Sequence, residues 1–280
     1  MGSRRNALSV AGTGLAAVSG LAWWAFWHEP RSVRLRRLTI NPPRWPAELD
    51  GLTVAVIADL HSGAPHVDAR RVERIVRRLN REGPVLAALL GDYTDPAVAL
   101  GHRVEPEDVA RALGRLEPAL GSFAVLGNHD WHEHGGAMPR ALRAEGIVVL
   151  ENDAVAVDGA PAPLWIAGVA DATTRTPSLE QALAVVPTED PVLLLSHNPD
   201  LFPEVPGRVA LTLAGHTHGA QVDLPVVRDK VTPSDHGAHY TNGHQIEGGR
   251  HLFVSPGVGT SRLPVRFRAR PEITLLRLAA

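Results

Sequence analysis

The chain contains five apolar runs, and each of them is followed by a short polar motif. The runs occupy residues 53–58, 85–90, 123–126, 192–195 and 209–214. Near-continuous apolar runs of this length are typical of β-strands that are covered on both faces. Between the first two runs, Val72, Ile75, Val76 and Leu79 recur with a helical period, and Asp68 stands where an N-cap is expected. The pattern therefore predicts alternating strands and helices.

The same periodicity predicts the remaining elements. Helices are expected over residues 107–116, 137–144 and 178–186, the last capped by Ser178. Short strands are expected over residues 147–150, 155–157, 164–168, 252–255 and 273–278. Residues 235–250 contain many Gly and His and are expected to form an ordered surface loop or flap. The chain is thus predicted to be one α/β domain with helices outside and sheets inside.

The polar motifs that follow the apolar runs supply carboxylates, an amide and imidazoles. They are Asp59-Leu60-His61, Gly91-Asp92, Gly127-Asn128-His129-Asp130, Ser196-His197-Asn198 and Gly215-His216-Thr217-His218. In open α/β sheets, ligands gather outside the carboxyl ends of the strands. We therefore expect these side chains to meet in one site, and their donor types are those of a two-metal hydrolytic centre.

The spacing within the motifs suggests individual roles. Asp59 and His61 are two residues apart, so in an extended segment both would point to the same side and reach one ion. A carboxylate with an imidazole suits Mn, Fe or Zn better than Mg. Asp92 is the natural shared ligand, because two metals about 3.5–4 Å apart need an anion between them. The alternative role for Asp92, capping a turn, is better suited to Asp95 before Pro96. Asn128 can offer a carbonyl oxygen to a metal.

In this order the five motifs resemble the pattern of the calcineurin-like metallophosphoesterase superfamily, and the match covers residues 53–218. Residues 91–95, 127–131 and 257–273 are more specifically similar to a bacterial, membrane-associated phosphodiesterase branch. The resemblance implies a four-layer αββα sandwich of two mixed β-sheets flanked by helices.

The resemblance also implies a role for each residue. One metal would be held by Asp59, His61, Asp92 and His218, and the other by Asp92, Asn128, His197 and His216. The cofactors would be two divalent or trivalent ions, with Mn, Fe or Zn favoured, and a hydroxide between them would attack phosphorus. His129 would face the substrate and protonate the leaving oxygen, and Asp130 would orient His129.

The predicted function is hydrolysis of a phosphate ester, in particular by a phosphodiesterase or pyrophosphatase. A phosphomonoesterase or nuclease on the same site, and an inactive metal-binding scaffold, remain alternatives at this point. Retention of His129 argues against the scaffold, since a dead site would be expected to lose it. The sequence has no Gly-rich phosphate loop and no Gly-x-Ser-x-Gly motif, which argues against an NTPase or a serine hydrolase.

Charge and cysteine content limit the kinds of partner and chemistry that are expected. The net charge of −2 gives no reason to expect a nucleic-acid partner, yet an anionic substrate is compatible, because bound cations would dominate the local field. The 280 residues include no cysteine, which excludes disulfides, thiolate ligands and cysteine nucleophiles.

The amino terminus is predicted to be a targeting segment. Arg4 and Arg5 precede residues 6–27, which contain no charged side chain, and together they resemble a bacterial twin-arginine export signal. Ala7 and Ser9 depart from that consensus, which favours Phe and Lys there. Residues 1–30 are accordingly assigned to a signal or an amino-terminal membrane anchor, and residues 31–280 to the metallophosphoesterase domain.

The flanks of this segment leave its orientation open. The stretch is close to the roughly 20 residues that cross a bilayer, and Trp23, Trp24 and Trp27 suit its interface. Export by the twin-arginine machinery would place the enzyme at the outer face of the cytoplasmic membrane or release it, with lipid or envelope material as substrate source. The arginines that follow instead favour an anchor whose enzyme faces the cytoplasm: Arg31, Arg34, Arg36 and Arg37.

Overall fold

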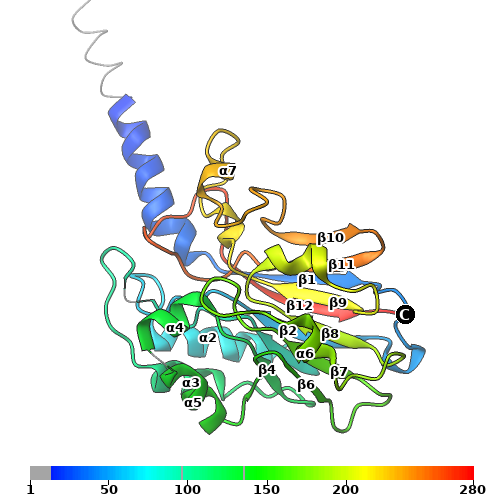
Figure 1. The fold of residues 1–280 in the computed structure, drawn as a ribbon. Helices are drawn as coiled ribbons and strands as arrows, with labels where there is room; N and C mark the ends of the chain where they lie inside the picture. The colour runs from blue at the N-terminus through cyan, green and yellow to red at the C-terminus, as the bar shows by residue number, and fades with distance from the viewer. Residues whose placement is uncertain (1–13, 96, 135) are drawn as a thin grey trace, which may run out of the picture.

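Two β-sheets lie face to face, with helices covering their outer surfaces (Figure 1). The structure is a computed structural model that describes residues 14–95, 97–134 and 136–280. Within these residues each sheet has six strands. The first sheet, in spatial order, consists of β1 (Arg34–Ile40), β12 (Glu272–Leu278), β2 (Leu52–Ile57), β3 (Leu86–Leu89), β4 (Ser122–Ala124) and β5 (Val148–Val149). The second consists of β10 (Gly243–Glu247), β11 (Arg250–Val254), β9 (Leu211–Ala214), β8 (Val192–Leu195), β7 (Trp165–Gly168) and β6 (Asp153–Ala156).

The helices are short apart from one. They are α2 (Ala69–Asn80), α3 (Pro106–Leu113), α4 (Asn128–His134), α5 (Ala137–Ala144), α6 (Leu179–Leu183) and α7 (Arg228–Val231). Short segments of other helix types are η1 (Trp24–His28), η2 (Glu29–Arg31), η3 (Ala47–Leu49), η4 (Pro199–Glu204) and η5 (His218–Ala220).

Three buried layers explain why the strands are apolar on both faces. Alternate residues of β2 point in opposite directions, so Val54 and Val56 lie between the two sheets, while Ala55 and Ile57 face the helices. α2, α3 and α5 cover the outside of the first sheet, and α6 with η4 covers the second. The predicted four-layer αββα sandwich is therefore confirmed.

The strand directions bring the polar motifs to one edge. β2, β3, β4 and β5 run parallel, and so do β7, β8, β9 and β11 in the second sheet. The carboxyl ends of β2, β3, β4, β8 and β9 consequently share one end of the sandwich, where all five motifs lie. The predicted helix caps are also present: Asp68 accepts the N–H of Arg71 (2.7 Å), and Ser178 accepts that of Gln181 (3.2 Å).

Two strands were not predicted from the sequence. β1 carries alternating arginines at the sheet edge, where Arg34 pairs with the fully buried Glu272 (2.6 Å), so its polar pattern concealed a strand. β10 lies within the segment predicted to be a loop. It pairs with β11 through a two-residue turn, Gly248-Gly249, with φ of 56° and 78°. Such a glycine pair is a recognised hairpin signal that the loop prediction overlooked.

The amino-terminal segment packs on the domain before the predicted boundary at residue 31. Residues 14–23 are helical and project from the body (Figure 1), whereas Ala25, Glu29 and Pro30 are buried. Arg266 donates its backbone N–H to the Ala25 carbonyl (2.9 Å), and Trp24 donates to the Glu29 carboxylate (2.8 Å).

Arg4 and Arg5, the predicted export signal, lie outside the described residues. Across the part of the chain that the structure describes, no helix combines the length and apolarity needed to span a bilayer.

Candidate metal centre

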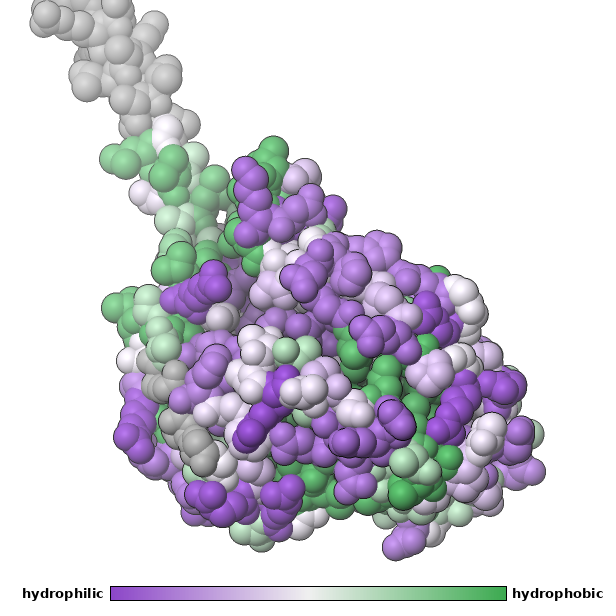
Figure 2. Space-filling model, in the orientation of Figure 1, coloured by the Kyte–Doolittle hydropathy of each residue, from purple (hydrophilic) through white to green (hydrophobic). Residues whose placement is uncertain are grey.

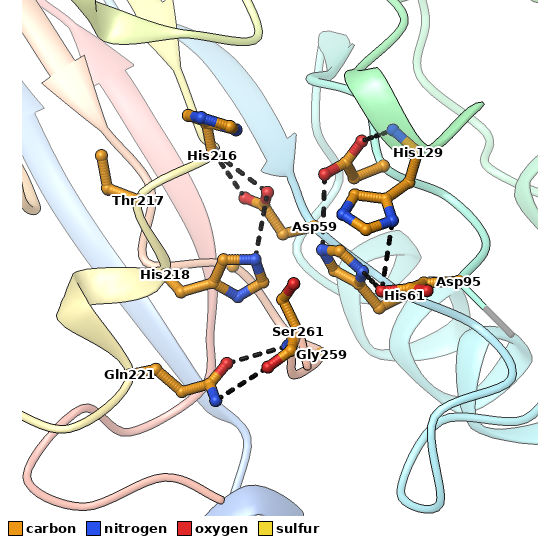
Figure 3. Close-up of polar contacts among 12 residues, drawn as sticks. Asp59, His61, Asp95, His129, His216, Thr217, His218, Gln221, Gly259 and Ser261 are labelled. Atoms are coloured by element: carbon orange, nitrogen blue, oxygen red, sulfur yellow. Dashed lines mark hydrogen bonds and ion pairs between the residues drawn. The ribbon is translucent and has the colours of Figure 1, made fainter. Parts of the chain in front are cut away.

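The structure groups six of the seven sequence-predicted metal ligands at one site: Asp59, His61, Asp92, His197, His216 and His218. Figure 3 shows Asp59, His61, His216 and His218 side by side there. Asn128, the seventh, directly precedes His129, whose N–H donates to Asp92 Oδ1 (2.9 Å). Asp59 and His61 follow β2, Asp92 follows β3, and Asn128 begins α4 just after β4. From the second sheet come His197 after β8, and His216 and His218 after β9. The site therefore lies at the edge of the sandwich where the carboxyl ends of strands from both sheets come together.

The ligand atoms fall into groups small enough to hold an ion. One group is Asp59, His61 and His218, and a second is Asp92, His197 and His216, with all ligand atoms of a group within 4.8 Å of one another. Each group is part of a set that the family resemblance implied, the first without Asp92 and the second without Asn128. The Oδ2 atom of Asp92 lies 3.4 Å from His61 Nε2 and 3.3 Å from His197 Nε2, so it stands between the groups.

Unpartnered polar atoms show that the site suits cations. His61 Nε2 and Asn128 Oδ1 are buried without a hydrogen-bond partner, and buried polar groups of proteins are normally paired. His197 Nδ1 donates to the Leu90 carbonyl (2.7 Å), so in the neutral ring the lone pair available to a metal is on Nε2, 3.3 Å from Asp92 Oδ2. Carboxylate, imidazole and amide donors together suit Mn, Fe or Zn ions.

The backbone of the ligand loops is unusual. φ is positive at five of the seven ligands: Asp59 (49°), His61 (43°), Asp92 (54°), His216 (70°) and His218 (54°). Left-handed backbone at a residue other than Gly costs of order 1 kcal/mol, and it clusters at functional sites. The spacing argument for Asp59 and His61 assumed an extended backbone, and that assumption is wrong, although both side chains do reach the same group.

Asp95 orients two of the site histidines. Its Oδ2 lies 2.9 Å from His61 Nδ1 and 3.3 Å from His129 Nδ1 (Figure 3). A proton on His61 Nδ1 leaves Nε2 free as a metal ligand, which is how carboxylates commonly fix the tautomer of a ligating histidine. Burial raises the pKa of Asp95, but the hydrogen bonds from His129 and His61 outweigh it and hold that pKa well below its usual range. The sequence analysis had assigned Asp95 only to turn capping.

Asp130 has a different role from the one predicted. Its Oδ2 accepts the backbone N–H groups of Asp92 (2.8 Å) and Gly127 (2.9 Å), and its Oδ1 accepts that of Tyr93 (2.9 Å). The carboxylate thereby ties the loop after β3 to the loop after β4. The expectation that Asp130 orients His129 is corrected, because the carboxylate at the His129 ring belongs to Asp95.

We expect Asp95→Ala to lower kcat/KM by about 10–100-fold, which is typical for loss of a carboxylate that orients a metal-bound histidine. Metal affinity should fall as well, because the His61 ring would no longer be held. Titration of the metal-free protein with Mn²⁺ and steady-state kinetics would measure both effects. Asp190→Ala is a matched control, since that carboxylate accepts the indole N–H of Trp165 (2.9 Å) at the amino end of β7, whereas the site lies beyond the carboxyl ends of the strands. Unchanged metal affinity and rate in Asp95→Ala would contradict the orienting role.

His129, like His216, is a ring of the site that is only partly buried. Its side chain is 22% exposed, and its backbone N–H donates to Asp92 Oδ1 (2.9 Å). Burial lowers the pKa of His129, but the hydrogen bond with Asp95 and the charges of Asp92 and Asp95 raise it overall to about 9. The protonated ring is the form that can donate a proton, although bound cations would act in the opposite direction. His129 also forms a third possible ligand group with His61 and Asp92.

Close backbone approach around the ligands requires glycine at two positions. A Cβ on Gly127 would collide with Asp92 Oδ1, and one on Gly257 would lie 2.6 Å from the Cβ of Asp59. Gly257 belongs to the loop after β11, where the Gly259 N–H also bonds the Asp59 carbonyl (2.6 Å). The sequence analysis did not predict that the loop after β11 packs against Asp59. The expectation that functional loops follow the carboxyl ends of buried strands applies equally to the apolar run at 252–255.

Comparison with known proteins agrees with this geometry. Residues 52–220 match the model of the calcineurin-like phosphoesterase family. Among similar proteins, the Bacillus subtilis metallophosphoesterase YkuE is 30% identical over 268 residues, covering 95% of this chain and 92% of the relative. The Escherichia coli phosphodiesterase YaeI is 28% identical and covers 99% of each chain. The Chlamydia trachomatis UDP-2,3-diacylglucosamine pyrophosphatase LpxG is 27% identical and covers 95% of each. The chain therefore belongs to the calcineurin-like metallophosphoesterases and is a metal-dependent phosphoester hydrolase.

Proposed function

We propose that the protein is a binuclear metal-dependent enzyme that hydrolyses a phosphodiester or a pyrophosphate. The observation that carries the proposal is the position of Asp92. Its Oδ2 lies within 3.4 Å of ring nitrogens from both ligand groups, as a carboxylate shared by two ions would. A single-metal site would have no need of a second ligand group.

The residues divide the chemistry among them. Two bound ions would activate a water molecule and neutralise the phosphoryl oxygens. Asp92 would be the ligand that the two groups share, and Asp95 would keep the His61 and His129 rings in fixed orientations. His129, a partly exposed ring, would donate a proton to the leaving oxygen.

The choice of a diester or pyrophosphate over a monoester is supported by the relatives. YaeI is named a phosphodiesterase and LpxG a pyrophosphatase, and both match nearly the whole chain. A proton donor beside the site also suits alkoxide and phosphate leaving groups, which depart poorly without protonation.

Metal analysis followed by a substrate panel tests the proposal. The purified enzyme should contain two Mn, Fe or Zn ions per chain. It should hydrolyse a diester such as bis(p-nitrophenyl) phosphate, or a pyrophosphate-linked lipid, with higher kcat/KM than p-nitrophenyl phosphate. A preference for the monoester would make it a phosphomonoesterase, and a preference for DNA or RNA a nuclease. Full metal content without turnover on any of these would make it a scaffold.

We also propose that residues 1–30 direct export by the twin-arginine route. Changing Arg4→Lys and Arg5→Lys together should block translocation and leave active, metal-loaded enzyme in the cytoplasm, because this route carries folded proteins. Activity measured in separated cytoplasmic, membrane and extracellular fractions would show the shift, with Arg36→Lys and Arg37→Lys as the matched control. Undisturbed export of the Arg4/Arg5 variant would remove the twin-arginine interpretation and favour an anchored enzyme facing the cytoplasm.

A further inference from the structure

Large apolar side chains are exposed around one end of the molecule. Single exposed apolar residues are ordinary, but a contiguous set marks an interaction surface. We call the following set the apolar rim: Trp24 (44% exposed), Trp27 (55%), Leu100 (87%), Val226 (80%), Val231 (47%) and Leu263 (54%). Figure 2 shows apolar surface on the projecting amino-terminal helix and on the nearby loop around α7.

Hydrogen bonds join the segments that carry the rim into one surface. They are Ala99 N–H to the Arg262 carbonyl (2.9 Å), Gln221 Nε2 to the Leu263 carbonyl (3.0 Å), Asp223 N–H to the Phe267 carbonyl (2.9 Å) and Arg266 N–H to the Ala25 carbonyl (2.9 Å). The rim residues therefore occupy neighbouring loops that are tied to one another, and they are not scattered over the surface.

Cationic side chains accompany the rim. Residues 261–270 contain four arginines and no acidic residue, and Arg262 and Arg268 are exposed. Arg31 stacks over the Trp27 ring, with its guanidinium carbon 3.3 Å from the ring centre. In the α7 segment, the charge of Asp223 is offset by its pairing with Arg228 (3.3 Å), whereas Asp229 accepts the neutral Ala238 N–H (3.1 Å) and keeps its charge. Tryptophan, aliphatic and arginine side chains together are typical of surfaces that bind anionic bilayers.

The rim is built on the loops that carry the metal ligands. The buried Arg266 donates from Nε to the Gly259 carbonyl (2.8 Å) and from Nη1 to the carbonyl of the predicted ligand His218 (3.2 Å). Gln221 and Ser261 lie beside His218 in Figure 3, and Leu263 is two residues beyond Ser261. The rim and the metal centre thus occupy the same end of the sandwich.

We propose that the apolar rim docks on the surface of an anionic phospholipid bilayer and brings the metal centre to the lipid–water interface. The rim residues enter the interfacial layer, and the arginines beside them meet the lipid phosphates. Trp24 and Trp27 belong to the amino-terminal segment, but the other four rim residues lie in the folded domain, and a tether through the amino terminus alone would not place them at the bilayer: Leu100, Val226, Val231 and Leu263. The docking is distinguished from a tether by these four. It concerns the orientation of the enzyme and does not depend on which phosphate ester is hydrolysed.

Site-specific labelling tests the proposal on the full chain. Because the protein has no cysteine, Val226→Cys and Leu263→Cys can each be labelled with a polarity-sensitive nitrobenzoxadiazole dye. The matched controls are Val185→Cys beyond α6 and Ile246→Cys in β10, whose side chains are similarly exposed (57% and 58%). On phosphatidylcholine vesicles containing phosphatidylglycerol, dyes at the rim should shift to the blue and brighten, while the control dyes should not. Silent rim dyes on chains that co-sediment with the vesicles would overturn the proposal and leave a tether alone.

Charge reversal tests the electrostatic part. Arg262→Glu combined with Arg268→Glu should lower the affinity for phosphatidylglycerol-containing vesicles, measured by titration of the dye response, by more than about tenfold. Each arginine near an anionic surface raises that affinity by about fivefold. Arg277→Glu in β12 is the control, since that side chain pairs with Asp50 in another part of the molecule. An equal response on vesicles of phosphatidylcholine alone, or an unaffected double variant, would contradict the choice of an anionic surface.

Discussion

Asp92→Ala is expected to remove both metal ions together and to abolish turnover. The carboxylate lies between the two ligand groups, 3.4 Å from His61 Nε2 and 3.3 Å from His197 Nε2. Without it, two cations about 3.5–4 Å apart would face each other with no shared anion to offset their repulsion. The variant also frees the backbone N–H of His129, which Asp92 accepts at 2.9 Å. Elemental analysis of the purified variant would measure the loss directly.

Variants of single groups provide the contrast for Asp92. His61→Ala removes a ligand of the first group and should mainly weaken one ion, and His216→Ala should mainly weaken the other. Asp92→Asn should behave like Asp92→Ala, because an amide lacks the charge that a bridging position requires. Two metals per chain in purified Asp92→Ala would show that the bridging assignment is wrong.

His129→Ala is expected to keep both metals and to lose turnover by about 10²–10⁴-fold, the usual contribution of a general acid. The ring is partly exposed, and its Nδ1 contacts Asp95, so we assign it to the substrate and not to the ions. The loss should be largest for alkoxide leaving groups. It should be much smaller for p-nitrophenolate, which departs without a proton.

Two results would change this assignment. Equal losses with good and poor leaving groups would limit His129 to an electrostatic or positioning role. Loss of a metal ion would make it a ligand, consistent with the third group that it forms with His61 and Asp92. Asp95→Ala, measured on the same substrates, separates loss of the proton donor from loss of its orientation, because that variant keeps the His129 side chain but removes the carboxylate that orients it.

Much of the fold and most of the site follow from local sequence. Strands that are buried on both faces must be apolar along their whole length, so the apolar runs located the central strands of both sheets. Parallel strands present their carboxyl ends at one edge, so the polar residues after those runs include the six candidate ligands that the structure groups together, and His129. The helix caps Asp68 and Ser178 could also be predicted, because a cap side chain bonds a backbone N–H only three residues further along the chain.

Other features were decided by contacts between distant parts of the chain. β1 reads as a polar arginine run, and only its pairing with β12, and the buried Glu272, make it a strand. The roles of Asp95 and Asp130 depended on how the loop after β3 meets the loop after β4, and adjacency in sequence pointed to the wrong carboxylate. The left-handed backbone at Asp59 and His61 is unfavourable on its own and is held by surrounding loops, so no local rule predicts it. The apolar rim likewise arises only when residues 24–31, 97–101, 221–231 and 261–267 come together. Local patterns thus determine which residues are buried and where strands end, whereas the partner of each side chain depends on the approach of remote segments, which only the tertiary structure decides.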